Sequence, residues 1–364
     1  MAIDLLIKLA LAGAVIFAVL NLAGIQTWVE RKQSAIMQDR VGANRAYFAL
    51  PWRWAVPINW FLRKLGGLGL LHPVADVIKL LTKEDFVPAT GNRFLHTLAP
   101  WISVFFAILA FCAIPFGDHL QLFGRTIELQ VAHLDGGLLY ILALASIGVY
   151  GVILAGMASG SNYAALGGLR AASQMLAYEI ALGVSLVGVI LWYGSLDLQT
   201  IIRAQGHYLW GWLPAWGVVV QPVGCIVFMT AALAETKRIP FDLPESEPEI
   251  IGYFVEYSGM KFGLFFLTDF VETVLVAALT TVLFFGGWQI PWLSPTAFST
   301  NVMALLGVGA FTLKVCFFLW LFMAIRWTLP RFRYDQLMRL GWKGLFPISL
   351  ANVGLTGLLR VLVH

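Results

Sequence analysis

The sequence predicts an all-α polytopic membrane protein in which residues 1–364 form one integral membrane domain. Hydrophobic residues make up 59% of the chain and charged residues only 12%, about half the usual charged fraction. The apolar runs are long and do not alternate with polar residues, which favours helices over the strands of a barrel. The net charge of +4 follows from membrane topology and indicates no nucleic-acid partner.

Apolar runs long enough to cross a bilayer predict eight transmembrane helices. A helix needs roughly 20 mainly apolar residues to span the hydrocarbon, and it satisfies its backbone hydrogen bonds internally. The first run has no convincing small-residue cleavage site, so we expect a span there rather than a signal peptide. The eight spans are expected at about residues 2–27, 95–115, 137–158, 170–193, 212–234, 262–286, 301–325 and 344–362.

The distribution of Lys and Arg predicts how these helices are oriented. Nineteen of the 24 basic residues fall in loops on one side of the membrane, and basic loops face the cytoplasm by the positive-inside rule. Both termini then lie on the non-cytoplasmic side, and a bacterial inner (plasma) membrane is the favoured location. The cytoplasmic loops comprise residues 28–94, 159–170, an acidic loop at 235–261 and a basic loop at 326–343.

Two of the cytoplasmic loops contain patterns typical of surface helices. Val74, Val77, Ile78 and Leu81 follow helical spacing, which predicts an amphipathic helix lying at the membrane interface. A similar pattern predicts another such helix around residues 58–65. The basic loop has three charged residues at steps of four that would share one helix face: Arg331, Asp335 and Arg339.

The acidic loop is the most informative polar segment because it concentrates carboxylates in an apolar chain. The chain has only 20 Asp and Glu residues in total. Six of them lie in or beside this loop: Glu235, Asp242, Glu245, Glu247, Glu249 and Glu256. We interpret the loop as lining a water-filled cavity, where irregular backbone is tolerated at membrane depth. The alternative is a solvated loop, although apolar residues such as Phe241 and Ile251 would be unusual there.

Proline spacing predicts the backbone of the acidic loop. Pro240, Pro244 and Pro248 remove helix donors at every fourth position and so exclude a continuous helix. We therefore expect irregular backbone up to about Glu249. Beyond this residue, Ile250, Phe254 and Tyr257 follow helical spacing and predict a short helix.

Charged residues inside a membrane span are costly and are functional by default. Glu179 lies nine residues beyond Arg170, roughly 13 Å along a helix, and Gln174 and Tyr178 continue the row of residues that begins at Arg170. A proton-relay carboxyl whose pKa is raised by desolvation is the functional interpretation. The alternative is a neutral, hydrogen-bonded glutamate that fixes helix packing.

A second group of charges is expected deeper in the membrane. Asp269 and Glu272 are three residues apart and share one face of a predicted span. Lys314 lies near the middle of the next span, at a similar depth of roughly 16 to 18 Å. We predict that Lys314 lies closer to Glu272 than to Asp269. A structural ion pair is the alternative to a proton-relay role.

Motifs for bound cofactors are absent from the sequence. Cys112, Cys225 and Cys316 lie singly in apolar runs without metal-ligand or disulfide spacing, so they are interpreted as small core residues. No spacing indicates a haem, an iron-sulfur cluster or a phosphate-binding loop. No metal site is therefore predicted.

Five blocks of the sequence together resemble one family. They are ERKQSAIMQDRVGANR at 30–45, HPVADVIKLLTKE at 72–84, LRAASQMLAYE at 169–179, PFDLPESEPEIIGYFVEYSGMKFGLFFLTDF at 240–270 and PRFRYDQLM at 330–338. In this order, they resemble the quinone-site membrane subunit of respiratory complex I, the proton-translocating NADH:quinone oxidoreductase (the H subunit in bacteria, subunit 1 in mitochondria). Ala43, His72, Ala177 and Asp269 depart from the usual residues of the family, but none of them removes a charge.

The resemblance implies a subunit of an oxidoreductase and translocase that binds no redox cofactor and has no catalytic residue of its own. Quinone, ubiquinone or menaquinone, would be the substrate. Flavin and iron-sulfur clusters would lie in partner subunits. The partners would be peripheral-arm subunits near the terminal iron-sulfur cluster, other membrane-arm subunits and the lipid bilayer.

The resemblance also implies roles for individual residues. The proton route would involve Glu179 and Glu235, to which the charges inside the spans add Asp269, Glu272 and Lys314. A coupling loop that senses quinone reduction would contain Asp242, Glu245, Glu247 and Glu249, and Glu256 of the same acidic segment is assigned to it as well. The quinone chamber and its subunit interface would be shaped by Arg31, Arg40, Arg45, Asp76, Arg170 and Arg326.

Two other functions are compatible with buried carboxylates in a membrane protein. One is the membrane subunit of an energy-converting hydrogenase, a group related to complex I, although the carboxylate blocks favour the quinone enzyme. The other is an ion-coupled secondary transporter. Against it, the sequence shows neither inverted repeats nor paired broken helices in its two halves.

Overall fold

The computed structural model describes residues 2–47, 49–52, 55–122, 124–209, 211–243, 252–293 and 298–363. Two short antiparallel hairpins are formed by β1 (His119–Leu122) with β2 (Arg125–Glu128), and by β3 (Tyr208–Leu209) with β4 (Leu213–Pro214). The helices are α1 (Ala2–Met37), α2 (Val56–Leu68), α3 (His72–Thr82), α4 (Arg93–Leu109), α5 (Gly137–Ala158), α6 (Asn162–Tyr193), α7 (Leu198–Gln205), α8 (Gly217–Val220), α9 (Pro222–Glu235), α10 (Gly259–Phe284), α11 (Thr300–Thr328), α12 (Tyr334–Arg339) and α13 (Phe346–Val363).

These helices confirm the predicted all-α membrane fold. Within the described residues, seven helices are long and apolar enough to cross a membrane. They are α1, α4 with a 3₁₀ turn at its end, α5, α6, α10, α11 and the continuous helix made by α12, a π-helical turn (Leu340–Leu345) and α13. The bent pair of α2 and α3 would be an eighth span if counted as one, and the shorter apolar helix α9 packs against α6 and α10.

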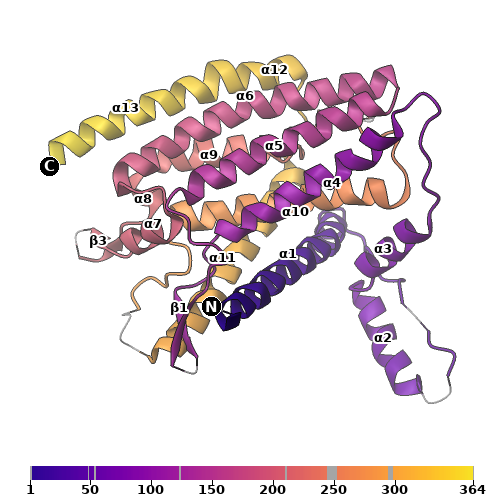
Figure 1. The fold of residues 1–364 in the computed structure, drawn as a ribbon, viewed down its shortest axis with the longest axis horizontal. Coiled ribbons are helices and arrows are strands. Elements are labelled where there is room, and N and C mark those ends of the chain that lie inside the picture. Colours follow the sequence, from indigo (N-terminus) through magenta and orange to yellow (C-terminus); the bar gives the residue numbers. More distant parts are fainter. Residues whose placement is uncertain are drawn as a thin grey trace.

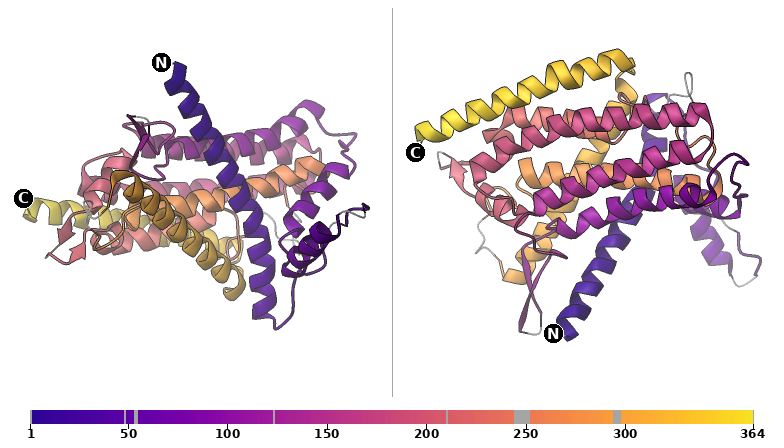
Figure 2. Two further views of the ribbon diagram at one scale, coloured as in Figure 1. Left: turned by 90° about the horizontal axis from the view of Figure 1, so that it is seen from below. Right: turned by 45° about the horizontal axis from the view of Figure 1, so that its top comes forward.

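The helices form a stack that is crossed by two steeply inclined helices. α4, α5, α6 and α13 lie side by side, with α9 and α10 behind them (Figure 1). α1 and α11 run across this stack at a steep angle (Figure 2). α10 is the most deeply buried of the long helices and α1 the least. The centre of the core is formed by side chains such as Phe228, Phe270 and Phe284.

Close contact between α5 and α6 depends on small residues. A Cβ atom at Gly156 would lie only 2.7 Å from the carbonyl oxygen of Ala164 and 3.2 Å from the Cα of Gly168. Glycine at this position lets the two backbones approach as membrane helices often do. This contact positions α6, which carries the partly buried Glu179.

The predicted span at residues 212–234 is wrong in its first half. The hairpin of β3 and β4 ends at Pro214, the single turn of α8 follows, and α9 begins only at Pro222. Each proline removes a helix donor, so the continuous helix expected from apolarity is interrupted. α9 contains 14 residues and is therefore about 21 Å long.

Two smaller helix predictions are also corrected. Arg331 does not share a helix with Asp335 and Arg339, because α12 begins at Tyr334 after an extended segment that contains Pro330. The helix expected after Glu249 is not found in the described part, where residues 253–256 form a turn. Gly252 has a φ of +124°, which ends any regular helix at that point.

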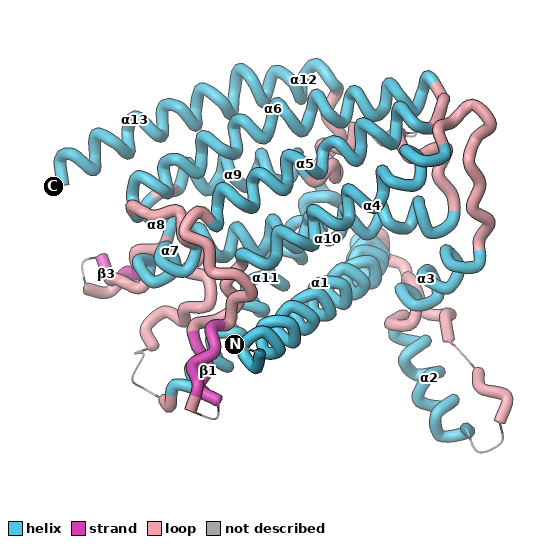
Figure 3. The backbone as a smooth tube through the Cα atoms, in the orientation of Figure 1, coloured by secondary structure: helices cyan, strands magenta, loops and turns pink. Residues whose placement is uncertain are grey.

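Helices are present at both segments of residues 28–94 where surface helices were predicted. α2 and α3 cover the two expected segments and meet at an angle of 95°, and they project from the body of the molecule (Figure 3). The apolar side chains of Val74, Val77 and Leu81 on α3 are exposed in the isolated chain. Among the cysteines, Cys225 is buried as expected, whereas Cys316 is exposed, so its assignment as a core residue is wrong.

Candidate functional site

A buried lysine organises the charges beneath the acidic loop. Lys237 follows the end of α9 and has a φ of +56°, an uncommon conformation for a residue with a Cβ. Its side chain is only 1% exposed, and its Nζ lies 3.0 Å from Asp269 Oδ1 and 3.7 Å from Glu272 Oε2. Burial opposes its charge, but the two carboxylates outweigh burial and raise the pKa of Lys237 well above its ordinary value. Lys237 is therefore a buried lysine that pairs with two acids of α10.

Two carboxylates face a small cavity next to this lysine. Glu235, the last residue of α9, and Glu272 line a cavity of about 50 Å³ whose other walls are almost entirely apolar, with side chains such as Phe106 and Met175. A cavity of this size has room for a few water molecules, and Glu235, Thr236 and Glu272 are its polar lining residues. Glu235 also interacts electrostatically with Glu179. The arrangement can pass protons between acids through water.

Glu179 on α6 contacts the neighbouring helix α5. Gln174, which lies earlier on α6, contacts the acidic loop. Ser146 on α5 donates a hydrogen bond to the Glu179 carboxylate. One turn earlier on α6, the Gln174 side chain donates to the carbonyl oxygens of Ala234 and Phe241, at 2.8 and 2.7 Å. This amide therefore holds both ends of the turn that contains Lys237.

An acid on the first helix bridges two arginines. Glu30 on α1 lies 2.7 Å from Arg326 on α11 and 3.6 Å from Arg238. The guanidinium of Arg238 lies 4.0 Å above the ring of Phe270 on α10, a favourable cation–π position. Three helices and the segment after α9 thus meet at one partly buried cluster.

Asp242 continues this network into the acidic loop. Its carboxylate is 3.1 Å from Arg331. Burial raises the pKa of Asp242 to about 6, an effect that Arg331, Arg326 and Arg238 oppose. The segment is held in place by the stacked rings of Phe241 and Phe332, with centroids 5.4 Å apart. Asp242 can therefore change its charge near neutral pH at the entrance to the buried cluster.

Comparison with known proteins identifies the family of this chain. A family model described as NADH dehydrogenase matches residues 9–357, which is nearly the whole chain. This chain belongs to the NADH dehydrogenase family. The resemblance predicted from the sequence blocks is therefore confirmed.

Several curated members of the NADH dehydrogenase family are similar over nearly their full length. The H subunit of NADH-quinone oxidoreductase from Thermomicrobium roseum is 46% identical, and the match covers 96% of this chain and 95% of the relative. The first of the H subunits of the same enzyme from Geobacter metallireducens is 45% identical, with 99% and 98% covered. Subunit 8 of the enzyme from Rhodothermus marinus is 43% identical, with 96% and 95% covered.

Lys314 of this NADH dehydrogenase family member contacts backbone carbonyl groups rather than a carboxylate. Lys314 donates hydrogen bonds to the carbonyl oxygens of Phe285, Gly287 and Gln289, at 2.7 to 2.9 Å. Phe285 follows the end of α10, 13 residues beyond Glu272, which is roughly 20 Å along the helix. Lys314 is thus on the Glu272 side of Asp269, as predicted. Among the described residues, the alternative of a structural ion pair is not observed, because α11 crosses α10 and brings Lys314 to the carbonyl groups beyond its end.

The residues expected in a quinone chamber lie in three separate places. Arg31 on α1 and Asp76 on α3 form an exposed ion pair at 2.6 Å, and Arg40 and Arg45 are also exposed. Arg326 instead belongs to the Glu30 cluster. On α6, the guanidinium of Arg170 lies 5.7 Å above the ring of Tyr334.

Part of the expected coupling loop is not described. Glu245, Glu247 and Glu249 lie outside the described residues. Glu256 lies in the turn before α10, where its backbone carbonyl lies 3.2 Å from the ring nitrogen Nε2 of His96. Asp242 is therefore the member of this loop that the structure connects to the buried cluster.

Sequence reasoning missed three residues of the charged cluster in this member of the NADH dehydrogenase family. Lys237 and Arg238 were interpreted only as charges that set the orientation, and Glu30 only as part of a matching block. Each pairs with residues far away in the sequence, so helical spacing gave no indication of a partner. The one available signal was the position of Lys237 and Arg238 directly after Glu235, in an otherwise apolar stretch.

Proposed function

We propose that this chain is the membrane subunit of a proton-translocating NADH:quinone oxidoreductase that forms much of the quinone-access chamber and couples quinone reduction to proton movement. Membership of the NADH dehydrogenase family and relatives named as H subunits of NADH-quinone oxidoreductase support the enzyme class. The coupling role rests on one observation above all. Lys237, Asp269, Glu272 and Glu235 form a buried charged group that reaches both the acidic loop and a cavity.

Electrostatics gives this group a means of coupling. Reduction of a quinone to quinol takes up two protons, and protons drawn from nearby carboxyl groups leave negative charge in a poorly screened region. Two unit charges about 4 Å apart interact by about 4 kcal/mol at an effective dielectric near 20, and one pKa unit is about 1.4 kcal/mol. A proton lost at one acid therefore changes the proton affinity of its neighbours, and the group titrates as a unit.

The sequence of contacts suggests a direction for the coupling. Asp242 and Arg331 lie at the loop, Lys237 is held next to the same loop by Gln174, and Glu235 faces the cavity. In our proposal, reduction of a quinone bound next to the acidic loop withdraws protons from Asp242, Glu245, Glu247 and Glu249. The charge change passes through Lys237 to Glu235 and then to Glu179.

The proposed chamber lies where α1, α3 and the acidic loop meet. The Arg31–Asp76 ion pair joins α1 to α3, and the exposed apolar face of α3 offers a surface for a quinone tail, lipid or a peripheral-arm subunit. The chain would hold no redox cofactor, and flavin and iron-sulfur clusters would belong to partner subunits. Lys314 is not part of the proposed proton route, because its three bonds go to backbone carbonyls.

We also propose that the acidic loop faces the cytoplasm and both termini face the opposite side. The ion pair between Asp4 and Arg125, at 2.7 Å, keeps the N-terminal end of α1 beside the hairpin of β1 and β2. This hairpin follows the end of α4 and precedes the start of α5, so it lies away from the acidic loop. The excess of basic residues near that loop supports its cytoplasmic location.

Conservative substitutions in the purified complex test the coupling role. Glu235→Gln and Glu179→Gln should each impair coupled quinone reduction and proton pumping while the complex still assembles, because only an ionisable oxygen is lost. Glu128→Gln is the matched control, since Glu128 is exposed on β2. Turnover and pumping at the control level in both variants would refute the relay.

Cofactor analysis of the complex tests the enzyme class itself. Flavin and iron-sulfur clusters with NADH:quinone activity would support the proposal. Nickel would instead indicate an energy-converting hydrogenase. A cofactor-free chain that accumulates a solute would indicate a transporter.

A further inference from the structure

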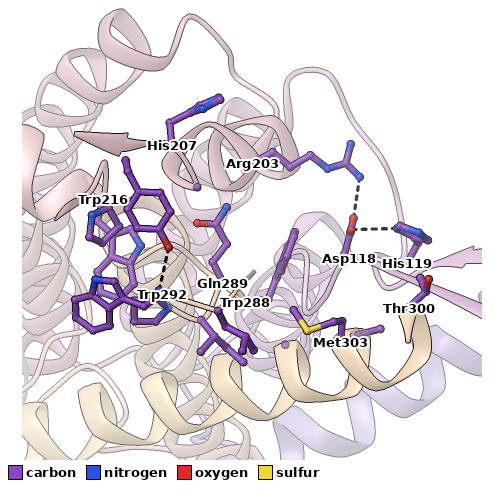
Figure 4. Close-up of a pocket in the computed structure, with 18 residues that line it drawn as sticks. Asp118, His119, Arg203, His207, Trp216, Trp288, Gln289, Trp292, Thr300 and Met303 are labelled. Carbon is purple, nitrogen blue, oxygen red and sulfur yellow. Dashed lines mark hydrogen bonds and ion pairs between the residues drawn. The ribbon is translucent and has the colours of Figure 1, made fainter. Parts of the chain in front are cut away.

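A second pocket lies at the opposite end of the molecule from the acidic loop. It encloses about 770 Å³ between the end of α7, the segment after α10 and the start of α11, within the usual range for ligand sites. Its walls combine tryptophan rings with charged and imidazole side chains (Figure 4). The lining includes Asp118, Arg203, His207, Trp288 and Trp292.

The aromatic wall is fixed in place although it is exposed. Trp292 has a φ of +61°, a strained conformation for a bulky residue. Its backbone N–H donates to the Tyr208 hydroxyl at 2.9 Å, and its indole N–H donates to the carbonyl of Trp212 at 3.0 Å. The side chain nevertheless remains 71% exposed. The chain therefore holds a large ring rigidly against an open pocket.

At the polar end of the pocket, the guanidinium of Arg203 has more hydrogen-bond donors than its carboxylate partner uses. Arg203 pairs through one nitrogen with Asp118, at 2.9 Å, and the same carboxylate lies 3.1 Å from His119. A guanidinium carries five N–H donors, and Arg203 is 58% exposed. His207 lines the pocket beside it (Figure 4). This combination suits a phosphate group, which arginine binds with several donors at once.

An apolar groove continues from the pocket along α11. The groove encloses about 670 Å³ and shares Gln289, Ile290 and Pro291 with the pocket. Its walls on α11 run from Val302 to Lys314, a length of roughly 18 Å at the helical rise. One leaflet of a bilayer has a hydrocarbon depth of about 15 Å, half of the full thickness. The groove therefore matches the length of an acyl chain in one leaflet.

We propose that the pocket and groove bind one glycerophospholipid of the leaflet on this side of the membrane. The phosphate lies at Arg203 and His207, the glycerol region packs against Trp288 and Trp292, and one acyl chain occupies the groove on α11. Tryptophan rings favour this depth, where the membrane is apolar on one side and hydrated on the other. The site is separate from the carboxylate group, so the inference goes beyond the proposed function.

Photolabelling of the purified complex tests this proposal. The probe is phosphatidylglycerol with a diazirine on its acyl chain, and labelled peptides are mapped by mass spectrometry. We expect label on peptides from residues 298–313. Gly309→Trp should abolish that label, because a Cβ at Gly309 meets open space and the ring would fill the groove. Gly13→Trp on α1 is the matched control, since its Cβ also meets nothing within 4 Å.

Competition separates the headgroup from the acyl chain. Unlabelled phosphatidylglycerol should displace the probe, whereas diacylglycerol, which lacks the phosphate, should not. Arg203→Gln should remove this difference, and Asp118→Asn, which keeps the cation, should preserve it. Labelling that persists in Gly309→Trp, equal competition by both lipids, or no label on the wild-type segment would each overturn the proposal. The last result would mean that another subunit covers the groove.

Discussion

Replacing Lys237 with methionine removes one buried ammonium and keeps an unbranched apolar stem of similar length. Asp269 and Glu272, whose oxygens lie 3.0 and 3.7 Å from the ammonium, then lose the cation that they share. Removal of one partner from a buried ion pair typically costs about 3 to 5 kcal/mol. Here two acids are affected, so we expect the upper part of this range.

The assay compares the thermal inactivation midpoint of the purified complex and its amount in membranes. Lys237→Met should lower both at neutral pH, whereas the exposed Lys343→Met should change neither. Combining Lys237→Met with Asp269→Asn removes one of the two uncompensated charges and should restore more than half of the lost stability. A single variant as stable as the wild type, or a double variant no better than the single one, would refute this account of the cluster.

Three further substitutions test other parts of the structure. Burial raises the pKa of Asp242 from 3.8 to about 6, so the folded chain keeps a proton there that the unfolded chain releases, and stability falls by about 3 kcal/mol as pH rises through this window. Asp242→Asn should therefore weaken the fall in thermal midpoint between about pH 4 and 7, and an unchanged fall contradicts this. Lys314→Met leaves three carbonyl oxygens without their charged donor and should lower the free energy of unfolding by about 3 kcal/mol. The thermal midpoint should fall, whereas the rate of quinone reduction per assembled complex should stay the same. Glu30→Gln leaves Arg238 and Arg326 without their shared anion, so it should reduce the amount of assembled complex in membranes, and a wild-type level counts against the bridging role.

The membrane fold could be predicted from sequence because burial in lipid leaves a strong compositional signal. The helix at residues 137–158 was predicted with the bounds that α5 has in the structure. The span at 212–234 failed because hydropathy averages over prolines, whereas Pro214 and Pro222 each interrupt the backbone. Long apolar runs therefore identified the helices, and individual residues decided where they are broken.

The candidate site was predicted only in part, for a geometric reason. Glu235 and Glu272 were expected to be functional because they are charged residues in apolar surroundings, and the structure brings both to one cavity. Lys314 was expected near Glu272 at a similar depth, since depth was counted along each helix as if the helices were parallel. Lys237 takes this place because the chain turns back after α9, and such a turn leaves no periodic signal in the sequence.

The steep path of α11 has a mechanical consequence. Lys314 fastens this helix to the carbonyl groups after α10, and Arg326 fastens it to Glu30 on α1. The two anchors are 12 residues apart, roughly 18 Å along the axis. We expect α11 to move as one rigid helix between these two contacts. A displacement of Glu30 would then be transmitted along α11 to the carbonyl groups after α10, next to the tryptophan-lined pocket.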